Sequence, residues 1–196
     1  DWRSMLDEYA VGLQALEDNG VPIIIRPFHE FNRTVYWWSY NNSTQTSARF
    51  ITLWQQTYDY LVTTKGLDNL LFMWGPTLGA GLSPANTANW YPGSSYVDII
   101  GVSNYRGTTW DAGDQTDLDY YANTVDSTKP FAIAEGFANN IDEPDGLDHA
   151  TVLDWIENDW PEVTYFMFWH DEKAPYTHPN PSTLWNDSLI YHRPVN

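Results

Sequence analysis

Five short apolar runs along the chain predict buried β-strands. They cover residues 21–28, 70–74, 97–102, 131–134 and 163–168. Continuous apolar runs of this length are typical of strands that are covered on both faces, as in a parallel sheet. The pattern therefore favours a parallel sheet of at least five strands.

Apolar residues at helical spacing lie ahead of most of these runs. They are Met5, Tyr9, Leu13 and Leu16 before the first run; Phe50, Leu53, Trp54, Tyr58 and Leu61 before the second; Leu118, Tyr121 and Val125 before the fourth; and Val152, Leu153 and Ile156 before the fifth. Gly20 and Gly66 follow the first two patterns as expected helix stops. Ser83-Pro84 predicts the start of a short helix between the second and third strands. Alternating helices and strands indicate one α/β domain over residues 1–196.

Composition excludes several classes of protein. The apolar share of 42% is ample for a buried core, so an acidic disordered chain is not expected. The formal charge of −17 repels phosphate and anionic lipid, which argues against binding to nucleic acid or to a membrane surface. There is no cysteine, and therefore no thiol nucleophile or thiolate metal site. Because the chain begins at Asp1, we interpret it as a mature, trimmed or excised segment.

Two carboxylates follow predicted strands. Glu30 comes after the first apolar run and Glu135 after the fourth. Sites in parallel α/β proteins form at the carboxyl ends of strands, where a charge after an apolar stretch is costly unless it is paired or used. A single such Glu would more often pair with an arginine or cap a helix. Two of them indicate the carboxylate pair that glycoside hydrolysis requires.

Aromatic residues accompany these carboxylates. The chain has 11 Trp, 13 Tyr and 8 Phe, many of them in polar loops, where they suit stacking against sugar rings or simply anchor the loops. Tyr105 and Trp169 follow the third and fifth runs and would flank the acidic pair. Arg26 shares strand parity with Glu30, so both side chains are expected to point the same way. Arg26 would either keep a neighbouring carboxylate ionised or form a structural ion pair.

One stretch of the chain resembles a known motif. Residues 26–32 read Arg-Pro-Phe-His-Glu-Phe-Asn and are followed by Tyr36-Trp37-Trp38. This resembles the acid/base motif of glycoside hydrolase family 26, in which a His-Glu pair ends barrel strand four and a Trp-rich loop follows. The Trp loop is offset from the family's usual spacing, which leaves open whether Trp37 or Trp38 faces the sugar.

Three later segments resemble the same family in the same order. Residues 96–105 resemble strand six with its active-site Tyr, residues 129–135 resemble strand seven with its nucleophile, and Phe168-Trp169 resembles strand eight with its stacking Trp. One departure is Gly136-Phe137 after the nucleophile, because the commoner order is Phe-Gly. The family consists mostly of endo-β-1,4-mannanases, with some β-glucanases and β-1,3-xylanases.

The resemblance implies retaining, endo-acting hydrolysis of β-1,4-mannan by a secreted, extracellular enzyme that needs no cofactor and no metal. It makes Glu30 the acid/base and Glu135 the nucleophile. The implied substrate-binding residues are His29, Trp37, Trp38, Tyr105, Trp169 and Arg26. His29 alone would otherwise be interpreted as a buried core histidine.

The resemblance also implies an incomplete fold, a partial (β/α)8 TIM barrel with strands four to eight only. The N-terminal part of a full barrel is absent from residues 1–196, and five strands cannot close on themselves. The chain would then be a fragment, associate with another copy or chain, or fold as an open sheet. If it is complete, two unpaired edges predict self-association.

Other functions compete with this interpretation. A non-catalytic carbohydrate-binding remnant would use the same aromatics without the two Glu residues, and an interaction subunit would need a partner chain. A β-glucan or β-xylan hydrolase of the same family is equally compatible with the motifs. His170-Asp171-Glu172, Asp142-Glu143 and Asp145 match no strong metal pattern and are interpreted as solvated acidic loops. Asn32-Arg33-Thr34 is a glycosylation sequence, relevant only in a secretory eukaryote.

Overall fold

The computed structural model describes residues 1–40, 44–105, 112–136, 148–169, 174, 176, 179–188 and 190. Its sheet has five parallel strands in the order β1-β2-β3-β4-β5. They are β1 (Ile23–Ile25), β2 (Leu70–Trp74), β3 (Ile99–Asn104), β4 (Phe131–Gly136) and β5 (Val163–Phe168). Because each strand pairs with the next in sequence, all five carboxyl ends meet at one edge of the sheet.

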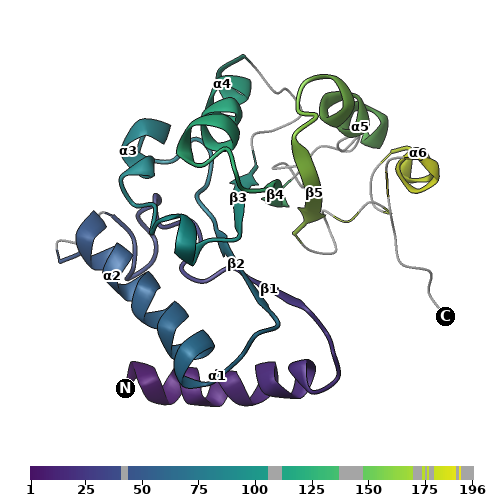
Figure 1. Ribbon diagram of the computed structural model, residues 1–196. Helices are drawn as coiled ribbons and strands as arrows, with labels where there is room; N and C mark the ends of the chain where they lie inside the picture. The colour runs from purple at the N-terminus through teal and green to yellow at the C-terminus, as the bar shows by residue number, and fades with distance from the viewer. Residues whose placement is uncertain are drawn as a thin grey trace.

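Helices connect the strands and lie around the outside of the curved sheet (Figure 1). They are α1 (Trp2–Glu17), α2 (Ser47–Tyr58), α3 (Pro84–Ala88), α4 (Ala112–Tyr120), α5 (His149–Asn158) and α6 (Pro181–Asn186). Two of them continue as π-helical turns, α2 into η1 (Asp59–Thr64) and α4 into η3 (Tyr121–Val125), and a 3₁₀ turn, η2 (Ser94–Tyr96), precedes β3. The α/β alternation predicted from the sequence is confirmed, whereas α6 was not predicted.

The predicted helix boundaries have their expected chemistry. Gly20 and Gly66 adopt φ values of 67° and 77°, which glycine reaches without steric penalty. Ser83 caps α3 by accepting from the backbone N–H of Asn86, and Pro84 occupies the first turn. These local signals were therefore sufficient to place three helix ends.

Burial differs between the centre and the edges of the sheet. Every residue of β3 is buried, as expected for a strand covered on both faces. At the two edges the pattern breaks down, because Ile24 in β1 is 45% exposed and Met167 in β5 is 51% exposed. Helix α1 is similar: Leu13 is buried, but Met5 of the same predicted apolar face is 72% exposed. Apolar surface is thus uncovered along both edges of the sheet.

Strand β1 is shorter than the apolar run that predicts it. Only Ile23–Ile25 pair with β2, and prolines at positions 22 and 27 flank the strand. Proline cannot donate to a strand ladder, so pairing stops on either side. The chain then turns, and Phe28 and Glu30 both have φ of 52°. The predicted strand parity of Arg26 and Glu30 is therefore wrong, because Glu30 does not lie on a strand.

Candidate active site

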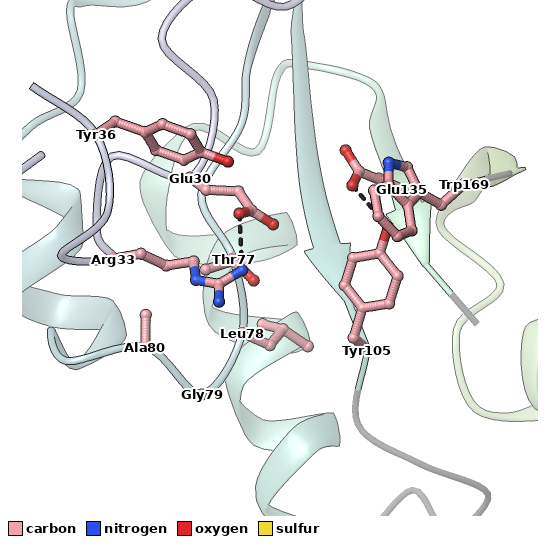
Figure 2. Close-up of a pocket in the computed structure, with 10 residues that line it drawn as sticks. All are labelled: Glu30, Arg33, Tyr36, Thr77, Leu78, Gly79, Ala80, Tyr105, Glu135 and Trp169. Carbon is pink, nitrogen blue, oxygen red and sulfur yellow. Dashed lines mark hydrogen bonds and ion pairs between the residues drawn. The ribbon is translucent and has the colours of Figure 1, made fainter. Parts of the chain in front are cut away.

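A cleft of about 520 Å³ lies at the carboxyl ends of the strands. Its lining residues are Glu30, Arg33, Tyr36, Thr77, Leu78, Gly79, Ala80, Tyr105, Glu135 and Trp169. Figure 2 shows Glu30 and Glu135 on opposite sides of this cleft, one carried by the loop after β1 and the other by the end of β4. The cleft therefore brings the two carboxylates of the predicted pair to one site.

Glu30 has a buried carboxylate with two unlike oxygens. The residue is only 3% exposed. Its Oε2 accepts a hydrogen bond of 3.0 Å from Nη1 of Arg33, a half-exposed cation on the same loop (Figure 2). Its Oε1 is buried and has no hydrogen-bond partner among the described residues. One oxygen is thus held by Arg33, and the other is unpaired in the described structure.

The loop that carries Glu30 is held in an unusual backbone conformation. Left-handed φ values at Phe28 and Glu30 cost roughly 1–3 kcal/mol each, and such strain persists only when the surroundings impose it. The Glu30 N–H donates to the carbonyl of Gly75 at 2.7 Å, which ties the loop to the end of β2. The Phe28 ring packs against Trp38 and Phe50, with ring centroids 6.0 and 6.2 Å apart. Backbone and aromatic contacts together fix the direction of the Glu30 side chain.

Glu135 has a donor on each oxygen. The hydroxyl of Tyr105 donates to Oε1 at 2.6 Å, and Nη2 of Arg26 donates to Oε2. The Arg26 and Glu135 side chains are 16% and 13% exposed, so this ion pair is largely shielded from water. Nη1 of Arg26 also donates to Oγ of Ser103 at 3.4 Å. Because both oxygens accept, the geometry is that of an ionised carboxylate.

Tyr105 and Trp169 form the wall beside Glu135. Burial and the hydrogen bond to Glu135 raise the pKa of the Tyr105 phenol far above its ordinary value, so it remains a donor. The Tyr105 and Trp169 rings meet edge to face, with centroids 5.9 Å apart (Figure 2). An aromatic wall next to a carboxylate suits the apolar face of a sugar ring.

His29 lies behind the opposite wall. Its Nε2 is 3.2 Å from the hydroxyl of Tyr36, the residue that lines the cleft there. Burial, followed by the charge of Arg26, lowers the pKa of His29, which favours the neutral imidazole. The Tyr36 ring stacks on Trp38 at 4.6 Å, and Nε1 of Trp38 donates to the His29 carbonyl at 2.9 Å. His29 and Trp38 thus support Tyr36.

The predicted site residues therefore separate into groups. Glu30, Glu135, Tyr105 and Trp169 line the cleft. Arg26 and His29 each bond to a lining residue, whereas Trp37 and Trp38 are not among the lining residues, and Trp37 is 61% exposed.

The sequence reasoning missed Arg33, Tyr36 and the segment 77–80 as lining residues. Segment 77–80 follows β2, and the strand-end rule used for the other strands would have found it. Arg33 had a weaker signal, its position three residues after Glu30.

The remaining predicted features concern metal binding, membrane crossing and glycosylation. His170, Asp171, Glu172, Asp142, Glu143 and Asp145 lie outside the described residues. Within the described ranges no group of three His, Cys, Asp or Glu side chains is placed to hold a metal ion. The helices of the described segments are all too short or too polar to cross a membrane. Asn32 of the glycosylation sequence is fully buried and hydrogen-bonded to Thr77.

Comparison with known proteins gives consistent relatives. The chain is 32% identical over 200 residues to mannan endo-1,4-beta-mannosidase A and B of Caldalkalibacillus mannanilyticus, with 98% of the chain covered. It is 31% identical over 190 residues to the mannan endo-1,4-beta-mannosidase of Bacillus subtilis strain 168, with 95% covered. It spans 36% and 49% of the lengths of these two relatives.

Solved structures support the fold. A Bacillus subtilis mannanase is 30% identical and superposes with a TM-score of 0.77 over 95% of this chain and 53% of its own. The five parallel strands are accordingly part of a (β/α)8 barrel, as expected from the sequence. The model of glycosyl hydrolase family 26 matches residues 2–193. The carboxylate cleft, the barrel segment and this match together show that the chain belongs to glycosyl hydrolase family 26.

Proposed function

We propose that this protein hydrolyses internal bonds of β-1,4-mannan with retention of anomeric configuration. The observation that supports this most strongly is that Glu30 and Glu135 line one cleft from two different strand ends (Figure 2). Their surroundings differ as two distinct chemical roles would require, since Glu135 has a donor on each oxygen and Glu30 keeps one oxygen without a partner in the described structure.

In the first step, an oxygen of Glu135 attacks the anomeric carbon and the bond to the leaving-group oxygen breaks. Glu30 gives its proton to that oxygen, so the leaving sugar departs as an alcohol and Glu30 becomes a carboxylate. The Tyr105 hydroxyl holds the attacking carboxylate in place through its 2.6 Å hydrogen bond. The product of this step is a glycosyl ester on Glu135.

In the second step, Glu30 acts as a base. It takes a proton from a water molecule, whose oxygen attacks the anomeric carbon and displaces Glu135. Two inversions give net retention, Glu30 is protonated again and Glu135 is again a carboxylate. Arg33 remains beside Glu30 throughout and offers a cation when Glu30 is ionised.

The aromatic residues supply the proposed substrate contacts. Trp169 and Tyr105 form one wall and Tyr36 the other, with His29 and Trp38 behind it. We place Trp37 further along the path of the polysaccharide, because it is exposed and outside the cleft lining. Mannan is favoured over β-glucan and β-xylan because the relatives at 31% and 32% identity are mannosidases. A carbohydrate-binding remnant without activity is the second candidate, since the apolar edges of the sheet are uncovered.

We also propose that residues 1–196 form one catalytic-type domain that lacks the N-terminal part of a full barrel and acts outside the cell. Relatives about twice as long and the exposed edge strands support the missing N-terminal part. Further parallel strands of a complete barrel would cover Ile24 and Met167. For residues 1–196 in isolation, light scattering at micromolar concentration should detect self-association. A well-folded monomer would contradict the need for edge coverage.

The function is tested with Glu30→Gln and Glu135→Gln against a matched surface variant, Glu8→Gln. Both cleft variants should lose reducing-sugar release from mannan by at least about 100-fold, as expected when an acid/base or a nucleophile is removed. Glu8→Gln should match the wild type, because Glu8 lies exposed on α1. NMR of the first product should show the β-anomer. Near-wild-type rates in either cleft variant, or retention on insoluble mannan without any hydrolysis by the wild type, would refute the proposal.

A further inference from the structure

The side chain of Asn32 joins two loops of the cleft. Its Nδ2 donates to the carbonyl of Thr77 at 2.8 Å, and its Oδ1 accepts from the Thr77 N–H at 2.9 Å. Asn32 is fully buried and Thr77 is only 6% exposed. This side chain therefore pairs with a backbone 45 residues away in the way that a neighbouring strand would, and water does not compete for either bond.

The two loops that Asn32 joins both contribute to the cleft. Glu30 lies two residues before Asn32 on the same loop. Among the described residues, one backbone hydrogen bond joins this loop to the end of β2, from the Glu30 N–H to the Gly75 carbonyl. On the other side, Thr77 begins the segment 77–80 that lines the cleft. The hydroxyl of Thr77 donates to the Ser103 carbonyl at 3.2 Å, which continues the connection to β3.

This connection compensates for a conformation that the loop would not keep alone. Strand pairing of β1 ends at Ile25, and Phe28 and Glu30 then adopt left-handed φ values. Such conformations relax unless neighbouring contacts impose them. Asn32 follows Glu30 closely enough to transmit any movement of the loop to the carboxylate.

We propose that Asn32 is a positioning residue that holds Glu30 where its proton reaches the leaving-group oxygen. The inference rests on the proposed role of Glu30 as acid/base. Asn32 touches neither the substrate nor the reacting atoms. It requires an amide, because one donor and one acceptor must face a peptide group at the same time.

The role is tested by varying the leaving group. The dinitrophenolate of a 2,4-dinitrophenyl β-mannobioside leaves without a proton, whereas the sugar that leaves from mannotetraose needs one. For Asn32→Asp, which keeps the acceptor and loses the donor, kcat/KM on mannotetraose should fall about 100-fold, the size expected for a displaced catalytic group. On the dinitrophenyl substrate it should fall less than about fivefold, because no general acid is needed. Asn32→Ala should behave similarly with a larger loss on mannotetraose.

Asn69 provides a matched control at the opposite end of the same two strands. Its Nδ2 donates to the Val21 carbonyl at 2.9 Å, and the Asn69 carbonyl accepts from the Ile23 N–H. Asn69→Asp should lower the melting temperature and leave the ratio of the two kcat/KM values within about twofold of the wild type. Equal ratios in Asn32→Asp and Asn69→Asp would overturn the positioning role, whatever their stability.

Failure of the proposed function gives a different result. In Glu30→Ala, the first step on the dinitrophenyl substrate should be spared, because it needs no acid. The second step loses its base, so azide should restore turnover. If azide does not restore it, Glu30 is not the acid/base. If the wild type hydrolyses neither substrate, the proposed function is refuted. Hydrogen exchange then still tests whether Asn32 holds the two loops together. The amides of Glu30 and Thr77 should then exchange faster in Asn32→Asp than in the wild type. Unchanged exchange at both amides would contradict the connection of the two loops through Asn32.

Discussion

The Tyr105 hydroxyl and the Glu135 carboxylate are joined by a 2.6 Å hydrogen bond between the ends of two adjacent strands. Strand β3 ends one residue before Tyr105, and Glu135 pairs with Ser103 in the last two residue pairs between β3 and β4. The register of the sheet therefore places the Tyr105 hydroxyl beside Oε1 of Glu135, while Arg26 contacts Oε2. Attack by Glu135 at an anomeric carbon would start from this single orientation.

Tyr105→Phe tests the contribution of this bond. Removing a hydrogen bond to a charged group costs about 1.5–3 kcal/mol, which corresponds to roughly ten- to a hundredfold in the rate of formation of the glycosyl-enzyme. Single-turnover kinetics on an aryl mannobioside would measure it. Tyr165→Phe is the matched control, because its hydroxyl contacts only Met73 Sδ at 3.5 Å among the bonds described. Equal rates in both variants would contradict the role of Tyr105.

The sequence was sufficient to find the two carboxylates because their signal is local: an apolar run that is followed by Glu. The same applies to Tyr105 and Trp169. It was not sufficient to find the support of Glu30. The shortening of β1 and the left-handed turn depend on tertiary contacts, and the partner of Asn32 lies 45 residues away.

The helix patterns show a similar division. Leu13 was correctly expected to be buried, but Met5 is exposed although it shares the same helical spacing. Periodicity identifies an apolar face, and it does not say whether an element is present to cover that face.

Arg26→Met tests the shielded ion pair with Glu135. Removing one partner of such a pair leaves an uncompensated charge and costs about 3 kcal/mol or more. Urea unfolding should therefore show a clear loss of stability. In Arg26→Met combined with Glu135→Gln the loss should be smaller than the sum of the two single losses, because no charge is left alone. Additive losses would mean that the two residues do not interact.

His29 predicts a pH dependence of stability. Its pKa is lowered in the folded protein by burial and by the charge of Arg26. Below about pH 6.5, the ordinary value for histidine, the unfolded chain therefore binds more protons than the folded one, and His29 reduces stability as the pH falls. Above that pH both states are neutral and the effect disappears.

The measurement is urea unfolding of the wild type and His29→Gln at pH 5 and pH 8. The wild type should lose more stability between pH 8 and pH 5 than His29→Gln, which retains a partner for Tyr36 and cannot be protonated. The same loss in both proteins would show that another group titrates. A larger loss in the variant would contradict the sign of the shift.

Gly136 tests how tightly Glu135 is positioned from the other side. A methyl group at Gly136 would overlap the backbone oxygen of Asn104, and backbone atoms cannot rotate away as a flexible side chain can. Gly136→Ala should therefore push β4 from β3 and displace Glu135 beside it, and a shift of about 1 Å costs on the order of 100-fold in rate. Gly12→Ala is the control, because nothing lies within 4 Å of a methyl group there and alanine favours a helix. It should raise the free energy of unfolding by roughly 0.5–1 kcal/mol and leave activity unchanged. Wild-type activity in Gly136→Ala would show that the strand yields without moving its carboxylate. The close approach of β3 and β4 would then have no part in placing Glu135.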